Sequence, residues 1–286
     1  MKILKYSVIF VITIEIILRL IGFGHPILYK KTINNFYPKP NQVTKRYKGS
    51  NIKINYIGMR TNFNWKDRDK KKKIVILGDS VTYGGSYIDN KNLFSEILCE
   101  KYIENSICGN LGVNGYFIDN IFLRLQDINE KYYDHIIILV SSKIRTGKTN
   151  IYEFPFYQEY NYFILRASFE VLNHILFKYE IFNAYNKNQK INKINEIEQT
   201  QNFINLINDI STKKKISFFI LPALEDLKSK DKNIRLLEKI KFKNVDLINL
   251  YDEIVKENYE DLYFNDAHLN KKGHRYVAKI IYDKIK

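Results

Sequence analysis

The sequence predicts an α/β fold: a three-layer α/β/α sandwich around a parallel sheet, preceded by one N-terminal transmembrane helix. Short apolar runs recur along the chain, and segments whose apolar residues have helical spacing separate them. Strands and helices that alternate at such intervals are typical of a parallel sheet with helices on both faces. A third observation is an apolar segment at residues 3–24, which is about the length that spans a bilayer as a helix.

The predicted strands leave room for a helix between each pair. The first, over residues 73–78, reads Lys-Ile-Val-Ile-Leu-Gly, a short continuous apolar run that indicates a buried strand. Further strands are expected at 106–110, 135–142, 216–221 and, as a short fifth strand or edge, 245–250. Helices are expected near 92–103, 117–130 and 203–210, and after Asn270, which is a plausible N-cap.

Three charged residues interrupt the N-terminal apolar segment: Lys5, Glu15 and Arg19. Glu15 and Arg19 are four residues apart, so a helix places them on one face, where they can pair. No convincing small-residue cleavage site follows the segment, and we therefore predict an uncleaved anchor over residues 1–25 rather than a removed signal peptide. The alternative is a buried helix of a soluble domain.

Two regions follow the predicted anchor. Residues 26–72 contain three prolines and little periodicity, which predicts a tether and entry segment. Residues 73–286 form the α/β domain, with an insertion at about 145–200. That insertion is rich in aromatic residues and could form a lid or a stacking surface for sugar rings, or pack on the core or the membrane. Its aromatic residues include Tyr152, Phe154, Phe156, Tyr157, Tyr160, Tyr162 and Phe163.

The net charge of +15 is spread over many scattered lysines. We interpret it as a solvated basic surface, with attraction to acidic glycans or lipid head groups as the functional alternative. No RNA- or DNA-binding signature accompanies the charge, so no nucleic-acid partner is expected. The five histidines have no paired spacing typical of zinc ligands, and neither a metal nor another cofactor is expected.

Ser80 stands in Gly78-Asp79-Ser80, directly after the first predicted strand. In open α/β sheets, ligands bind at the carboxyl ends of the strands. A serine hydroxyl needs an imidazole as base, and the imidazole needs a carboxylate to fix its tautomer. Asp266 and His268 supply both groups far downstream. The chain therefore has the residue types of a serine nucleophile system in the order Ser, Asp, His.

In these residues the sequence resembles the SGNH or GDSL hydrolases, and their membrane-anchored subgroup in particular. Three segments carry the resemblance in the expected order. The first is Gly-Asp-Ser-Val-Thr-Tyr-Gly, the second Asn-Leu-Gly-Val-Asn-Gly-Tyr, and the third Asp-Ala-His-Leu-Asn-Lys-Lys-Gly-His, at residues 78–84, 110–116 and 266–274. The resemblance covers roughly residues 51–286 and implies a flavodoxin-like sandwich.

The resemblance also implies roles for individual residues. Ser80 is expected to be the nucleophile, His268 the base, and Asp266 the group that orients His268. The backbone N–H groups of Ser80 and Gly115 are expected to form the oxyanion hole. Asp79 is interpreted as an acceptor that stabilises the turn.

One segment departs from the family pattern. The family carries a Gly-x-Asn-Asp motif after its third strand, and the asparagine amide helps to hold the oxyanion. Here the strand runs into Ser141-Ser142-Lys143, with no asparagine at the expected place. Loss of one donor typically costs on the order of a hundredfold in turnover. Three explanations are open: Ser142 or Lys143 substitutes, Asn114 reaches in from the second segment, or activity is low.

Four other residues have two interpretations each. Arg60 lies in a stretch that resembles the one preceding the serine in anchored relatives, and it either binds an acidic substrate group or makes a structural ion pair. Cys99 and Cys108, the only cysteines, either form a disulfide or remain buried free thiols. His274, one turn into the last helix, is expected to pack or cap rather than to catalyse.

The resemblance implies a membrane-anchored serine ester hydrolase that removes an acyl group, such as acetyl, from an envelope glycan or a small ester. An O-acyltransferase that modifies a surface polysaccharide is the first alternative, and a non-catalytic glycan-binding protein with a degenerate site is the second. We expect the domain on the periplasmic or extracytoplasmic side. A literal count of basic residues around the apolar segment would instead place it in the cytoplasm.

Overall fold

The computed structural model describes residues 2–33, 35–46, 50–65, 71–128, 133–145, 164–178, 193–231, 240–265 and 268–286. A five-stranded sheet lies at its centre, with the strand order β6–β5–β7–β8–β9. All of its neighbouring strands are parallel, which confirms the predicted α/β fold with a parallel sheet. The strands are β5 (Lys72–Gly78), β6 (Ser106–Asn110), β7 (His135–Ser141), β8 (Lys215–Leu221) and β9 (Leu247–Asn249).

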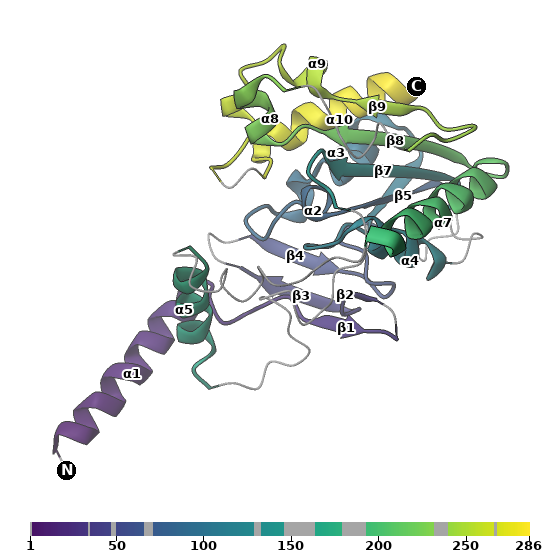
Figure 1. Ribbon diagram of the computed structural model, residues 1–286. Coiled ribbons are helices and arrows are strands. Elements are labelled where there is room, and N and C mark those ends of the chain that lie inside the picture. Colours follow the sequence, from purple (N-terminus) through teal and green to yellow (C-terminus); the bar gives the residue numbers. More distant parts are fainter. Residues whose placement is uncertain are drawn as a thin grey trace.

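Alternate residues of the strands face two separate cores. In β7, Ile136 and Ile138 belong to one buried cluster, whereas Ile137 and Leu139 belong to the other. The first cluster includes residues of α4 (Ile118–Gln126) and α7 (Lys193–Ser211), and the second includes residues of α3 (Phe94–Ile97), α9 (Tyr251–Ile254) and α10 (Lys271–Ile285). Helices therefore cover both faces of the sheet (Figure 1), and this burial explains why the strands read as continuous apolar runs.

The segment expected to be a tether folds into two short antiparallel pairs. Strand β1 (Tyr29–Lys31) pairs with β2 (Phe36–Pro38), and β3 (Gln42–Lys45) pairs with β4 (Asn51–Ile54). Tyr29, Phe36, Ile52 and Ile54 are buried in the same core as α4. Strands of three or four residues are too short to show a clear alternation in sequence, which is why prolines and low periodicity suggested a tether.

Helix α1 (Lys2–Leu20) projects from the rest of the molecule, and α5 (Arg166–Lys178) lies beside it (Figure 1). The sequence predicts a membrane-spanning helix over residues 1–25. Within the described parts of the chain, however, no helix combines the length and the hydropathy needed to cross a membrane. Lys5, Glu15 and Arg19 lower the apolar character of α1, and the predicted pair between Glu15 and Arg19 is present, with Nε and Oε1 2.7 Å apart.

Most of the predicted insertion lies outside the described residues. This includes every aromatic residue from Tyr152 to Phe163 on which the lid interpretation depends. The described part consists of α5, the two residues before it and the first turns of α7.

The two cysteines form a disulfide, which decides between the two interpretations. It joins Cys99, in the π-helical turn Leu98–Tyr102, to Cys108 in β6. The turn that follows α3 is thereby fixed to an outer strand of the sheet.

Glu96 is a buried carboxyl group that ties the entry segment to the domain. It lies in α3, and its Oε1 accepts a hydrogen bond from the Asn62 N–H at 3.0 Å. Burial raises its pKa to about 7, and the negative charge of Glu100 adds to this, although hydrogen bonds from Thr61 and Asn62 and the charge of Arg60 act in the opposite direction. The fold therefore favours the protonated carboxyl.

Because this pKa is raised on folding, Glu96 should make stability depend on pH. Its stabilising contribution is complete below the unfolded pKa of 4.5 and is lost as pH rises through about 7. Glu96→Gln keeps an acceptor for Asn62 and stays neutral, so at pH 8 it should raise the free energy of unfolding, by on the order of 2–3 kcal/mol. Urea unfolding of both proteins at pH 4.5 and pH 8 measures this. Glu100→Gln, at an exposed position of the next turn, is the control and should have a much smaller effect.

Candidate active site

Ser80 lies where three strand ends meet. It is the first residue of α2 (Ser80–Tyr83), two residues beyond the end of β5. The chain goes from β5 to β6 on one side and then to β7 on the other, so β5 is at the topological switch point, where open α/β sheets bind ligands. Ile76 pairs with Asn110, and Gly78 pairs with Leu139. Beyond the paired residues, the N–H of Val113 donates to the carbonyl of Gly78 at 3.2 Å, so the loop that carries Asn114 and Gly115 starts next to the turn of Ser80.

Asp79 fixes the turn that presents Ser80. Its Oδ1 accepts a hydrogen bond from the Val81 N–H at 3.1 Å, and its Oδ2 accepts one from the Ser141 N–H at 3.2 Å. The carboxyl group thus caps α2 and ties it to the end of β7, in agreement with its interpretation as a turn acceptor. Gly78 is required because a Cβ there would lie 1.9 Å from the carbonyl oxygen of Leu139.

The loop after β6 is held against α2 by Asn110. The Asn110 side chain donates to the Thr82 carbonyl at 2.6 Å and accepts from the Gly112 N–H at 2.9 Å. Gly112 packs so closely that a Cβ would lie 2.4 Å from the backbone nitrogen of Tyr83. Gly115 has φ +78°, a conformation that favours glycine. These contacts bring the loop carrying Gly115 to the serine turn.

His268 lies in a loop that is fixed on both sides. The Phe264 N–H donates to the His268 carbonyl at 2.7 Å, and Tyr263 and Leu269 form an antiparallel bridge. Asn270 caps α10, as predicted, by accepting from the N–H groups of Lys272 and Gly273. Asp266 lies outside the described residues, so its expected contact with His268 stays a prediction.

The charge of His268 reaches Asp79. Burial raises the pKa of Asp79 to about 6, and hydrogen bonds from Ser141 and Val81, together with the positive charge of His268, limit the rise. A ring contact between Tyr87 and Phe264, with centroids 6.2 Å apart, joins the two loops that follow Ser80 and precede His268. The loop of His268 therefore lies near the turn that Asp79 and Ser80 form.

His274 is buried one turn into α10 and is engaged in packing. Its Nδ1 accepts from the Phe94 N–H at 3.2 Å, and its ring stacks on that of Phe94. Burial lowers its pKa to about 3, with the positive charges of Arg60 and His268 contributing. It stays neutral, as expected of a packing residue.

The three candidates for the missing oxyanion donor are all engaged by other groups. The Ser142 hydroxyl donates to the carboxylate of Asp226, and the Lys143 ammonium pairs with the same carboxylate. Asp226 belongs to α8 (Leu224–Ser229), which follows β8. The Asn114 amide hydrogen-bonds the buried hydroxyl of Tyr29, in the entry segment. The sequence alone did not indicate either contact, because both partners are distant along the chain.

Arg60 makes no ion pair among its described contacts. It is fully buried, and its guanidinium donates to backbone carbonyls of the loop that follows Ser80. The acceptors are the carbonyls of Tyr83 at 2.8 Å, Gly85 at 2.5 Å and Ile88, and the side chain of Asn90 at 3.0 Å. Arg60 therefore holds the loop at 83–90 in place. Sequence reasoning missed this role because its partners are mostly backbone groups.

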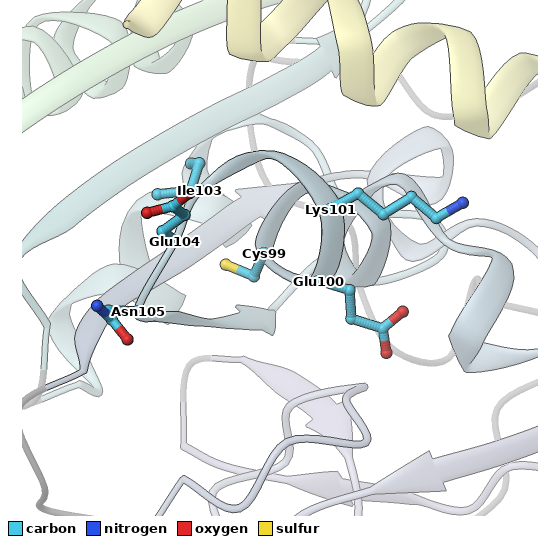
Figure 2. Close-up of a pocket in the computed structure, with 6 residues that line it drawn as sticks. All are labelled: Cys99, Glu100, Lys101, Ile103, Glu104 and Asn105. Atoms are coloured by element: carbon cyan, nitrogen blue, oxygen red, sulfur yellow. The ribbon is translucent and has the colours of Figure 1, made fainter.

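One hollow among the described residues lies away from Ser80. It has a volume of about 310 Å³ and is lined by residues between Cys99 and Asn105, directly before the start of β6 (Figure 2). That position is at the amino-terminal edge of the sheet, whereas Ser80 is at the carboxyl-terminal edge. This hollow is consequently not the candidate active site.

No family model and no curated protein matches this chain. Among solved structures, it is similar to a lipolytic G-D-S-L family protein from Veillonella parvula, at 17% identity over 75% of this chain and 98% of that chain, with a TM-score of 0.46. It is also similar to a lipase/acylhydrolase from Enterococcus faecalis, at 15% identity over 75% and 95% of the chains, with a TM-score of 0.45.

A third similar structure is a two-domain esterase active on acetylated mannans, at 17% identity. The match covers 76% of this chain and 50% of that chain, with a TM-score of 0.47. The structural neighbours are thus G-D-S-L lipolytic hydrolases and esterases. At these identities and TM-scores the likeness by itself assigns no activity.

Arg60→Lys should destabilise the protein and disturb the loop next to Ser80. A lysine ammonium is a point donor and cannot replace a planar fork that serves four acceptors. We expect a loss of about 2–4 kcal/mol in the free energy of unfolding, measured by urea denaturation. Arg275→Lys, on the exposed side of α10, is the matched control. Equal stability of the two variants would show that the buried fork is dispensable.

Proposed function

We propose that this chain is a serine ester hydrolase of SGNH type. The observation that carries the proposal is the position of Ser80 at the switch point of the sheet, with the loops of Gly115 and His268 brought to the same turn. A serine presented in this way, with an imidazole nearby, has the parts needed for acyl transfer.

The proposed reaction has two steps. Ser80 Oγ attacks the ester carbonyl carbon while His268 takes the hydroxyl proton, and the leaving alcohol receives that proton as the acyl–serine bond forms. Water then attacks the acyl-enzyme with His268 again as base, which releases the acid and restores the serine. In this proposal Asp266 orients His268, and the N–H groups of Ser80 and Gly115 hold the oxyanion.

We further propose Asn114 as the third oxyanion donor. Asn114 follows Val113, whose N–H donates to the carbonyl of Gly78, two residues before Ser80, and its partner is the neutral hydroxyl of Tyr29 rather than a charged group. The donors of Ser142 and Lys143, in contrast, are committed to the carboxylate of Asp226. Releasing either of them would leave a buried carboxylate with fewer partners, which is costly.

The proposed substrate is an acylated envelope glycan or a small ester, and the proposed location is the outer side of the inner or plasma membrane, with α1 as the attachment. The substrate class rests on the resemblance of the sequence segments. The disulfide between Cys99 and Cys108 supports an oxidising compartment.

Ser80 should react with a fluorophosphonate probe. We expect the full-length protein to be labelled at Ser80, and Ser80→Ala to lose labelling, because the probe traps an activated serine hydroxyl. Ser86→Ala is the matched control, since Ser86 is a similarly half-buried serine six residues on, and it should retain labelling. His268→Ala should slow labelling. An adduct at another residue would overturn the assignment of the nucleophile. Product analysis with an added glycan acceptor separates hydrolysis from acyl transfer.

Asn114→Ala should lower kcat by roughly ten- to a thousandfold with little change in KM, because an oxyanion donor acts mainly in the transition state. Steady-state kinetics on a chromogenic acetyl ester measures this. Tyr29→Phe is a useful companion, since it removes the hydroxyl that binds Asn114 without removing the amide. If Asn114→Ala is unaffected while Ser142→Ala or Lys143→Ala loses turnover, the donor comes from the end of β7.

A further inference from the structure

Helix α5 exposes apolar side chains and buries charged ones, which is the opposite of a surface helix that faces water. Phe169, Leu172 and Ile175 are 43%, 49% and 46% exposed, and their spacing of three places them on one side of the helix. Arg166 and Glu170, in contrast, are each only 7% exposed. A surface helix in water normally buries its apolar side and exposes its charges.

The buried carboxylate of Glu170 has two partners, one shortly after α1 and one directly after β3. Its carboxylate accepts from the Gly24 N–H at 2.8 Å and pairs with Arg46. Gly24 also packs closely on the helix, since a Cβ there would lie 3.1 Å from the Cβ of Ala167. These contacts fix which side of α5 points outward.

Glu15 of α1 forms the N-terminal cap of α5. Its carboxylate accepts from the N–H groups of Ala167 and Ser168, each at 2.9 Å, and from the Ser168 hydroxyl at 2.9 Å. The first N–H groups of a helix have no partner within it, so an acceptor from another element stabilises that end. Arg19 holds the same carboxylate from α1 and also donates to the Ile164 carbonyl at 3.1 Å. The two helices therefore form one unit.

The exposed side chains of α1 indicate what covers this unit. Residues 8–12 are consecutive apolar residues, and each is at least 40% exposed. Successive residues of a helix turn by about 100°, so five in a row surround the axis. A protein groove covers one side of a helix, whereas lipid covers all sides. The exposed Lys5 stands near the start of α1, and the chain has a net charge of +15, which suits an anionic lipid surface.

We propose that α5 is a second lipid-contacting helix, held beside α1 by the Glu15 cap, and that its stripe of Phe169, Leu172 and Ile175 lies in the interface of an anionic bilayer. Such a helix lies in the membrane plane with its apolar side in the acyl boundary. One helix alone would allow the domain to swivel about its base. The two contacts together fix the orientation of the sheet edge that carries Ser80.

The test uses tryptophan fluorescence of the full-length protein reconstituted in phosphatidylcholine–phosphatidylglycerol vesicles with brominated acyl chains. The single native Trp65 is 1% exposed and buried in the core, so it contributes a constant background. Leu172→Trp should lose most of its added fluorescence to bromine quenching. Val255→Trp is the matched control, because Val255 is a similarly exposed apolar residue after α9 (41%), at the opposite end of the molecule (Figure 1), and it should not be quenched.

The role of the cap is tested in the Leu172→Trp background. Glu15→Ala should reduce quenching at position 172 while the protein still floats with the vesicles through α1. Thr13→Ala, at an exposed position of α1 whose hydroxyl bonds the Ile9 carbonyl of the same helix, leaves the cap intact and should not reduce quenching. Absence of quenching at 172 would overturn the proposal. If Leu172→Cys also cross-links two chains through a disulfide, a second copy of the chain rather than lipid covers the stripe. Adding Ser80→Ala should change none of these results, which separates this proposal from the proposed esterase function.

Discussion

The candidate site depends on one buried carboxyl group, that of Asp79. It bonds the first turn of α2 through one oxygen and the end of β7 through the other, so it sets the place of Ser80 relative to two strands at once. Burial opposes its ionisation and raises its pKa to about 6, but two N–H donors and the charge of His268 limit that penalty. Since the folded pKa is above the ordinary value of 3.8, ionising Asp79 costs stability as pH rises toward 6. In return, the ionised carboxylate is a strong hydrogen-bond acceptor, and it orders the turn that carries Ser80.

The central sheet was predictable because its strands are buried on both faces. In β5 and β7 this burial demands uninterrupted Ile, Val and Leu, which is a strong sequence signal. The place of Ser80 at the carboxyl end of the sheet was predictable because Ser80 comes two residues after β5 in the sequence. The cap of α10 was predictable because asparagine is a common N-cap residue. What could not be predicted are contacts whose partners are backbone groups or distant residues. Arg60 bonds carbonyls that any residue would supply, and Asp226, which binds Ser142, lies far along the chain.

Glu15 shows a second limit of prediction from sequence, since only one of its contacts could be inferred. In a hydropathy profile it is a defect in an apolar helix, and its spacing to Arg19 predicts the pair that is observed. The pair accounts for only one of its contacts, however, because the same carboxylate also receives two backbone N–H groups and a hydroxyl from α5. A charge that lowers the apolar character of α1 is therefore what joins α1 to a helix more than a hundred residues later in the chain. Sequence spacing detects local partners of a charge and not such distant ones.

The entry segment links this helical unit to the candidate site. Arg46, which pairs with Glu170 of α5, follows β3, and Tyr29 of β1 bonds the Asn114 amide in the loop that follows β6. Tyr29 and Phe36 also belong to the core that covers one face of the sheet. A truncated chain without β1 and β2 would lose these two aromatic side chains and the partner of Asn114, and would open part of that core to water. The segment is consequently a structural part of the α/β domain, and its contacts are one reason why the loop carrying Asn114 and Gly115 has a defined place.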